Sequence, residues 1–438
     1  MLGAACALLM RLAGAQALGE AAPPAAGQPA SADPARAQAD AATPDPGKPD
    51  MAWALRTIPQ LPHGNEASPL APSLPLTQLA ADSITDEVEL RAHEGGWSLI
   101  WTGFDVQQQH AAPAASGVVD ELVLDRQWAG AQWALGKKVM SWDVGFGFRP
   151  LDVVQQENRR ALLVYALEGI PGVSAEVYGA DWAWTFVLAN PGSEEAALPR
   201  NDGSAAVRYF RRVGAADVYA VGRISRRDEA QAGSSFSWVV NDNFEWHASG
   251  LYQRRYELEL DELALAGTGG PALSEADPMR VFARHNAPLG LVGATWTSEA
   301  GWSVLGEAWY DGTAYRASDW AALQTLDARQ LALQSAGAAP AAAVAANLAY
   351  STDYYLPVNL LRGNLLLHAS WKIDSFTPVL DVLETPGDGG IVVTASAQHE
   401  GNRWRLDTGV RAFTGRADSA YRRLPVSRIF YLGLSFFP

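Results

Sequence analysis

Cysteine is almost absent from this chain. Of the 438 residues only Cys6 is a cysteine, and it lies in an apolar stretch at the N-terminus. A chain processed after that stretch would contain no thiol, which excludes disulfide bonds, thiolate zinc sites and cysteine nucleophiles. A chain without thiols suits the oxidising environment of a cell envelope.

Long apolar runs and an excess of positive charge are also lacking. Beyond the first 20 residues, no apolar run approaches the roughly 18 residues that a membrane-spanning helix needs. The 48 acidic residues outnumber the 33 basic residues, and the formal net charge is −15. This charge argues against a nucleic-acid partner, because phosphates are neutralised by clustered Lys and Arg.

Catalytic and cofactor motifs are missing as well. The seven histidines are scattered, with no H-E-x-x-H motif, no G-x-S-x-G elbow and no phosphate-binding glycine loop, so neither a cofactor nor a metal is indicated. His247, His285 and His368 are the candidates if the chain has an enzymatic site. The alternative, that each is an ordinary side chain of the fold, is favoured, and we predict no enzyme.

The N-terminus has the composition of a signal and a leader. Residues 1–18 are apolar and end in two small-x-small patterns, Ala13-Gly14-Ala15 and Ala15-Gln16-Ala17, of the type that a signal peptidase cleaves. A short buried helix is the alternative. Residues 19–50 are rich in Ala and Pro and poor in large apolar residues, which predicts a disordered periplasmic leader.

What the sequence does contain is alternation of apolar and polar or small residues, repeated in segments of about ten residues. Trp182, Trp184, Phe186 and Leu188 share one face of such a segment, because successive side chains of a strand point to opposite sides. The predicted strands cover 85–93, 97–103, 119–128, 131–139, 172–179, 181–190, 204–212, 216–225, 234–240, 243–256, 289–297, 301–310, 359–371, 375–382, 390–399, 403–413 and 428–437.

The connections alternate between short and long, as they do in outer-membrane barrels. The longest cover residues 140–171, 257–288 and 311–358. Both ends of a bacterial barrel lie in the periplasm, which requires an even number of strands, whereas the strands above number seventeen. A strand near Met51 to Thr57 would make eighteen, and one false assignment would make sixteen. We therefore predict an all-β fold, a transmembrane antiparallel up-and-down β-barrel of about 16–18 strands, covering residues 51–438 and embedded in outer-membrane lipid.

The last ten residues form an amphipathic segment that ends in aromatics. Phe430, Leu432, Leu434 and Phe436 alternate with Tyr431, Gly433 and Ser435. This segment, Phe430 to Phe437, resembles the C-terminal signature of outer-membrane barrels, and the resemblance implies that the barrel-assembly machinery recognises it. Pro438, after the aromatic pair, departs from that pattern.

A second resemblance lies in residues 135–152. Gly136, Lys137, Trp142, Gly145, Phe148, Pro150 and Asp152 match a segment found in porin-like outer-membrane families, including the alginate-export type. Asp143 and Lys138 depart from it. The match covers about 20 residues and implies passive or selective passage of small polar solutes.

The same segment supplies candidate residues for a pore constriction. Glycines 145 and 147 allow a tight fold, and aromatic side chains can pack the loop onto a wall. The charged candidates on this loop and its flanks are Lys137, Lys138, Arg149, Arg159 and Arg160, opposed by Asp143, Asp152 and Glu157, and Trp142 is the aromatic candidate. A salt-bridged surface loop is the alternative.

Two strand arginines are further candidates. Arg208 and Arg223 are predicted to face the lumen, because a charge that faces lipid at mid-membrane costs about 2–4 kcal/mol. A position beyond the membrane band is the alternative. Residues 319–350 carry leucines and Trp320 at helical spacing, which predicts a helix that caps or plugs the mouth, or that packs on the rim.

Three functions are open at this point. A channel for small polar or charged solutes is favoured, since sixteen or more strands leave an aqueous lumen. A barrel that serves as a structural or secretion partner, and a barrel enzyme of the outer leaflet, are the alternatives.

Overall fold

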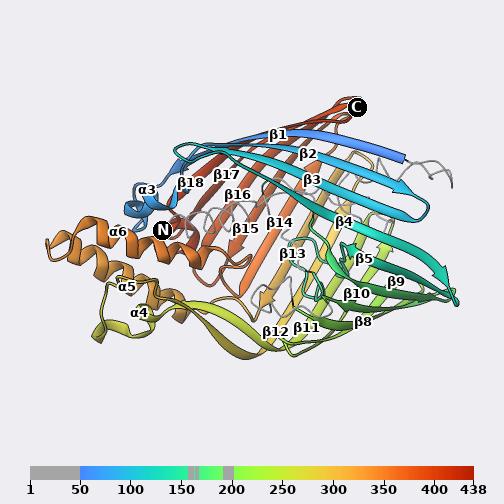
Figure 1. Cartoon of the computed structure of the whole chain (residues 1–438), viewed down its shortest axis with the longest axis horizontal. Helices are drawn as coiled ribbons and strands as arrows, with labels where there is room; N and C mark the ends of the chain where they lie inside the picture. The colour runs from blue at the N-terminus through green and yellow to red at the C-terminus, as the bar shows by residue number, and fades with distance from the viewer. Residues whose placement is uncertain (1–49, 156–161, 163–166, 191–201) are drawn as a thin grey trace.

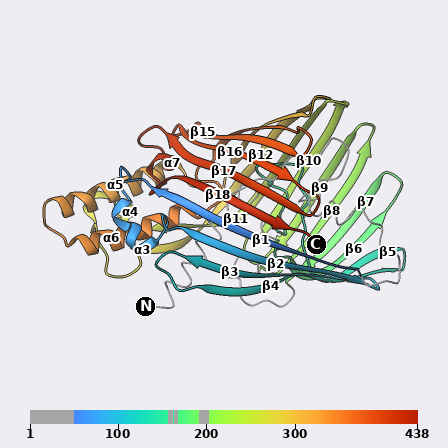
Figure 2. The same ribbon diagram turned by 90° about the horizontal axis from the view of Figure 1, so that it is seen from above.

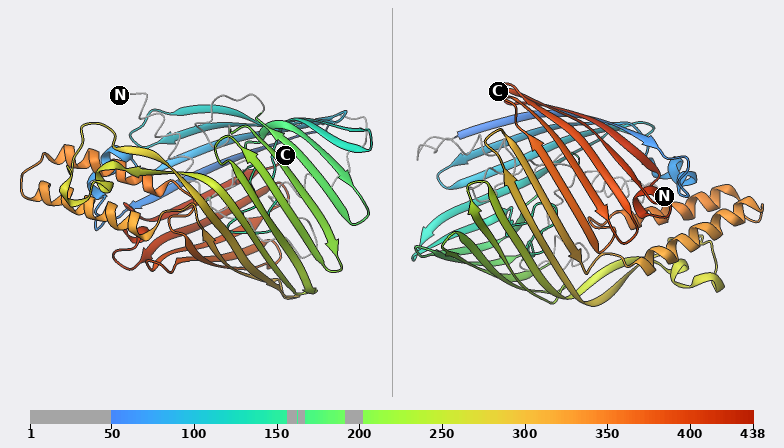
Figure 3. Two further views of the ribbon diagram at one scale, coloured as in Figure 1. Left: turned by 90° about the horizontal axis from the view of Figure 1, so that it is seen from below. Right: turned by 180° about the vertical axis from the view of Figure 1, so that it is seen from behind.

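The computed structural model describes residues 50–155, 162, 167–190 and 202–438. These residues form one antiparallel sheet of eighteen strands, each paired with its neighbours in the sequence. The first strand also pairs with the last, with Leu55 opposite Phe436 and Leu61 opposite Phe430, so the sheet closes into a barrel (Figure 1). Figure 3 shows the closure from behind.

The strands are β1 (Asp50–Gly64), β2 (Ser83–Glu94), β3 (Trp97–Gln108), β4 (Ala114–Trp128), β5 (Ala131–Lys138), β6 (Ile170–Tyr178), β7 (Trp182–Ala189), β8 (Ser204–Val213), β9 (Ala216–Ser225), β10 (Ala230–Asn241), β11 (Phe244–Asp261), β12 (Met279–Thr297), β13 (Trp302–Asp311), β14 (Gly363–Trp371), β15 (Phe376–Thr385), β16 (Gly390–Glu400), β17 (Trp404–Gly415) and β18 (Val426–Phe436). The helical segments are η1 (Ala71–Ser73), α3 (Leu74–Thr77), α4 (Glu262–Leu265), η3 (Gly267–Gly269), α5 (Ala317–Ser335), α6 (Ala341–Tyr350), η4 (Ser351–Tyr355) and α7 (Ala420–Arg423).

The strand near Met51 to Thr57 exists as β1, and the even count of eighteen is confirmed. β1 begins and β18 ends at the same end of the barrel, where the short turns lie, and we call this the short-turn end. The pairing of β1 with β18 is interrupted between Thr57 and Gln60, where Pro59 has no N–H to donate to the ladder. This proline is also why the alternation in β1 is weak in the sequence.

The outer face of the barrel is an apolar belt. In β7, Trp184, Phe186 and Leu188 are exposed, while the intervening Thr185 and Val187 are buried. The same alternation holds in β18, where the lipid-type face is Phe430, Leu432, Leu434 and Phe436. A closed barrel of this kind satisfies nearly all of its ladder hydrogen bonds internally and offers mainly apolar side chains to a bilayer.

Tryptophan gathers at one edge of this belt. Among the described residues, each tryptophan that is more than a third exposed lies within three residues of the short-turn end of its strand: Trp53, Trp97, Trp128, Trp182, Trp184, Trp238, Trp246, Trp296, Trp302, Trp371 and Trp404. Trp302 and Trp371 stack at 4.9 Å between ring centroids. Such a ring of aromatics is typical of the level of lipid headgroups.

The opposite end, which we call the loop end, carries a helical cap (Figure 2). We define the cap as residues 65–82, 262–278, 312–362 and 416–425. Helices α5 and α6 project beyond the strands and do not enter the barrel (Figure 1), so the helix predicted within 319–350 is two helices on the rim. Arg423 pairs with Asp327 at 2.7 Å, and Leu70 packs with Val344 and Leu348. Among the described helices, none has the length and apolar character needed to cross a membrane.

One predicted loop is wrong in its bounds. The connection placed at 257–288 covers only residues 262–278, because β11 continues to Asp261 and β12 starts at Met279. Tyr256, Leu258 and Leu260 alternate on the buried face of this extension. The hydroxyl of Tyr354 in the cap accepts a hydrogen bond from the N–H of Asp261 at 3.0 Å. The two strands extend because the cap supplies a core beyond the membrane. Residues 1–49, which contain the predicted signal and nearly all of the leader, lie outside the described residues.

Candidate pore and its internal loop

Residues 139–155, which follow β5, form a loop inside the barrel, and we call it the internal loop. At its tip the N–H groups of Phe146 and Gly147 donate to the two carboxylate oxygens of Glu307, each at 2.7 Å. Glu307 lies on β13, which is eight strands from β5 in the closed ring of eighteen. Trp302 and Tyr310 of β13 are on the exposed outer face. Both lie an odd number of residues from Glu307, so Glu307 is on the opposite face and points inward. The internal loop therefore crosses the lumen to the far wall.

Two buried aspartates give the internal loop its shape. Asp143 accepts hydrogen bonds from the N–H groups of Val144 at 2.7 Å and Leu151 at 2.6 Å. Asp152 accepts from the N–H of Asp143 at 2.9 Å and from that of Trp142. Burial raises the pKa of Asp143 to about 6, with the charge of Asp152 adding to the rise and the backbone donors opposing it.

Arg149 and two glycines complete the fold of the internal loop. Arg149 donates from Nε to the carbonyl oxygen of Gly145 at 2.7 Å and lies 3.6 Å from Asp152. A Cβ on Gly145 would stand 2.1 Å from the carbonyl oxygen of Phe148, and one on Gly147 would stand 2.7 Å from Leu366 Cδ2. The loop can reach the wall only because both positions are glycine.

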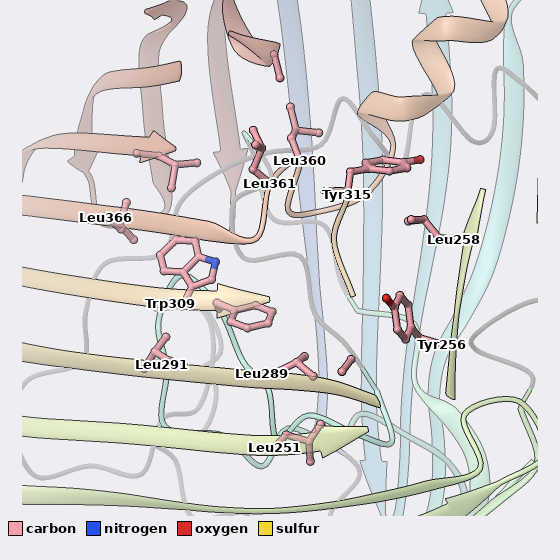
Figure 4. Close-up of a cluster of buried hydrophobic side chains, with 14 of the residues drawn as sticks. Leu251, Tyr256, Leu258, Leu289, Leu291, Trp309, Tyr315, Leu360, Leu361 and Leu366 are labelled. Atoms are coloured by element: carbon pink, nitrogen blue, oxygen red, sulfur yellow. The ribbon is translucent and has the colours of Figure 1, made fainter. Parts of the chain in front are cut away.

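The internal loop rests on an apolar area of the luminal wall. Leu251, Leu289, Leu291, Trp309 and Leu366 project inward from neighbouring strands (Figure 4), and Trp142, Phe148 and Leu151 of the loop belong to the same buried cluster. The rings of Phe148 and Trp309 stack at 6.1 Å. Full burial of each such side chain contributes about 1.5–3 kcal/mol. An apolar patch in a water-filled lumen is explained by the loop that covers it.

Two histidine–carboxylate pairs surround the tip of the loop. His247 Nε2 lies 3.0 Å from Glu307 Oε1, and both side chains are buried. His368 Nδ1 lies 2.7 Å from Asp381, and the ring of Phe146 packs on His368 at 5.0 Å. His247 and His368 are thus luminal, as expected of lone strand histidines. His285 is exposed near the loop end of β12.

The predicted constriction residues fall into two groups. Trp142, Asp143, Arg149 and Asp152 come together within the internal loop, where Arg149 pairs with Asp152 and each of the three charged side chains bonds to the loop backbone. Lys137 and Lys138 lie at the end of β5, where Lys137 Nζ bonds to Glu168 at 2.7 Å and Lys138 lies 3.8 Å from Asp125. Glu157, Arg159 and Arg160 lie outside the described residues.

The two strand arginines lie on the luminal faces of β8 and β9. The guanidinium of Arg208 stands 4.9 Å from the centre of the Tyr219 ring. Arg223 is buried and pairs with Asp202 and Asp228, both at 2.9 Å. Arg208 pairs across the strands with Thr185 and Val221, which are on the buried, inward side.

The sequence reasoning missed Glu307. An acidic residue in the middle of a strand, on the face opposite Trp302 and Tyr310, is expected to be luminal, so its orientation was available from the alternation. Its partners were not, because they come from a loop and from a strand that are distant in the sequence. Among the described residues, no group of three or more His, Cys, Asp or Glu is arranged to hold a metal ion.

No protein-family model and no curated protein matches this chain. Among solved structures, OccD3 (OpdP) of Pseudomonas aeruginosa has a TM-score of 0.50 at 6% identity, covering 89% of this chain and 91% of that one. OccK11 (OpdR) of the same organism has a TM-score of 0.49 at 8% identity, with 89% and 95% covered. A mutant of the Rh. blastica porin has a TM-score of 0.43 at 8% identity, with 89% and 100% covered.

The likeness to OccD3 is a likeness of fold. It agrees with the closed barrel, the apolar outer belt and the alternation of short turns with long loops. A closed barrel with an apolar outer belt has the properties of a β-barrel that spans a membrane. No family model supports the narrower resemblance to alginate-export proteins.

Proposed function

We propose that this protein is a channel that lets small polar or charged solutes cross the outer membrane, with the internal loop as its constriction. The observation that carries the proposal is the loop itself, which reaches across the lumen of an eighteen-stranded barrel to Glu307. Barrels of sixteen or more strands enclose an aqueous lumen. A loop held across such a lumen narrows it.

The charged side chains of the luminal wall support the proposal that the solutes are polar or charged. Arg56 on β1 is paired with Glu87 and Glu89 on β2, and Arg208 and Arg223 lie farther round the ring. Wall charges of both signs select solutes by charge and by hydrogen bonding. The candidates for constriction or solute contact are Lys137, Lys138, Trp142, Asp143, Arg149, Asp152, Arg208 and Arg223.

Reconstitution in planar lipid bilayers tests the channel. The purified protein, with its loops intact, is expected to produce discrete current steps and to let small sugars swell liposomes. Protein-free bilayers and vesicles are the control. Absence of both ion current and solute flux, from protein that shows the heat-modifiable migration of a folded barrel, would favour a structural or secretion partner and would contradict the channel.

A further inference from the structure

Glu307 has an unusual set of partners for a residue in a strand. Its two carboxylate oxygens each accept one N–H from adjacent residues of the internal loop, Phe146 and Gly147. Oε1 also lies 3.0 Å from His247 Nε2. An ionised carboxylate that accepts several N–H groups away from bulk water forms strong, charge-assisted hydrogen bonds. One side chain therefore holds the farthest point of the loop.

The wall beside Glu307 is built to accommodate this arrangement. His247 on β11 and Glu307 on β13 are separated by β12, where both pair with the same residue, Gly293. A Cβ on Gly293 would stand 2.3 Å from His247 Nε2 and 2.7 Å from Glu307 Cγ. The two side chains meet across an intervening strand only because that strand has no side chain there.

The internal loop is a folded unit apart from this attachment. Asp143, Asp152 and Arg149 bond to the loop backbone, and Met140 N–H donates to the side chain of Gln155 at 2.9 Å. At its base, Val139 N–H donates to Glu121 at 2.8 Å. A loop whose internal hydrogen bonds do not involve the far wall keeps its shape when the tip is released. Release at Glu307 therefore frees the tip from β13, while the apolar contacts of Phe148 and Leu151 with the wall remain.

We propose that Glu307, oriented by His247 across Gly293, is the positioning residue that holds the internal loop against β13 and so sets the size limit of the channel. This inference rests on the proposed channel function. Glu307 acts through the position of the loop, and contact with the solute is not required. The proposal predicts that loss of its reach, with its charge kept, is enough to widen the pore.

The test compares variants that weaken the attachment of the loop at Glu307 with variants that leave this attachment intact. Glu307→Asp keeps the charge and shortens the reach, Glu307→Gln keeps the reach and removes the charge, and Gly293→Ala keeps every polar group while pushing His247 and Glu307 apart. The matched controls are Glu245→Gln, a luminal carboxylate of β11 that bonds to Ser237, and Gly306→Ala, where a Cβ would meet nothing within 4 Å.

The readouts are single-channel conductance, open-channel current noise and the largest saccharide that swells liposomes. Glu307→Asp, Glu307→Gln and Gly293→Ala are each expected to raise conductance on the order of twofold and to admit larger saccharides, because a released loop narrows the lumen less. Both controls are expected to stay at the wild-type values. Heat-modifiable migration verifies that each variant is folded.

The outcomes separate the two hypotheses. If the wild type conducts but folded Glu307→Asp and Gly293→Ala keep its conductance and size limit, the role of Glu307 is refuted while the channel stands. If Glu245→Gln widens the pore as much as Glu307→Gln, luminal charge is responsible and the role of Glu307 is again refuted. A wild type that never conducts refutes the channel itself.

Discussion

At the scale of single residues, the shape of the internal loop depends on carboxylates that accept hydrogen bonds from the loop backbone. Asp152 is almost fully buried and accepts N–H groups from Trp142 and Asp143. The sequence identified Asp143 and Asp152 as important, but as charges that face a pore. The structure places both of them as acceptors within the loop, a role that depends on its folded backbone and that residue type alone does not reveal.

Asp152→Ala is expected to loosen the internal loop without unfolding the barrel. The change leaves two buried N–H groups without an acceptor, at a cost of about 1–3 kcal/mol for each. Hydrogen exchange of residues 141–152 is expected to accelerate, while that of the strands stays the same. Asp418→Ala removes an exposed carboxylate that pairs with Arg416 and is the control. Unchanged exchange in the loop of Asp152→Ala would argue against this role.

A second residue-scale prediction concerns pH. Burial raises the pKa of Asp327 in α5 from 3.8 to about 6, against the opposing charge of Arg423. Asp327 therefore binds its proton more tightly when α5 is packed in the cap than when α5 is exposed to solvent. The packing of α5 is most stable below the ordinary pKa of Asp327, and this stability is lost as the pH rises through about 6. Exchange of α5 amides, corrected for intrinsic rates, is expected to be slower near pH 4.5 than near pH 7.5.

Asp327→Asn is the control for this pH dependence. The variant has no titrating carboxyl at this position, so the difference between the two pH values is expected to disappear. An equal pH effect in the wild type and in Asp327→Asn would show that another group is responsible.

At the scale of elements, strands that alternate strongly were predicted with accurate bounds, and strands with an interrupted pattern were predicted only in part. β7 and β18 expose large apolar residues at every second position, and both were found within a residue or two. β1 contains Pro59 and Pro62, which weaken its signal. The extensions of β11 and β12 are covered by the cap. Alternation within a strand does not reveal that another part of the chain packs against its end.

The last strand provides a prediction at this scale. If the barrel-assembly machinery reads the aromatic residue that ends β18, Phe436→Ala is expected to lower the amount of assembled barrel in the outer membrane severalfold. Leu434→Ala removes a side chain of the same lipid-type face and is expected to have a smaller effect. Heat-modifiable barrel in membrane fractions is the measurement. Equal loss in both variants would point to lipid contact in place of recognition.

At the scale of the whole molecule, the fold class followed from repetition, and the requirement of an even number narrowed seventeen predicted strands to sixteen or eighteen, whereas the contents of the lumen could not be predicted. Alternation fixes which side of each strand faces outward, so the luminal position of Arg208 was predictable. The meeting of Phe146 with Glu307 is a contact between parts of the chain 161 residues apart. Pairings of that kind depend on how the ring closes, and local patterns do not contain this information.

The ring of tryptophans at the short-turn end has a consequence for how the protein sits in bilayers of different thickness. Indole rings prefer the level of the lipid headgroups, so the short-turn end is expected to stay at a fixed depth in the bilayer. A thicker or thinner bilayer is then accommodated at the other rim, by tilt or local deformation of lipid. The height of the helical cap above the bilayer surface would then change with bilayer thickness, while the short-turn end of the barrel keeps its depth.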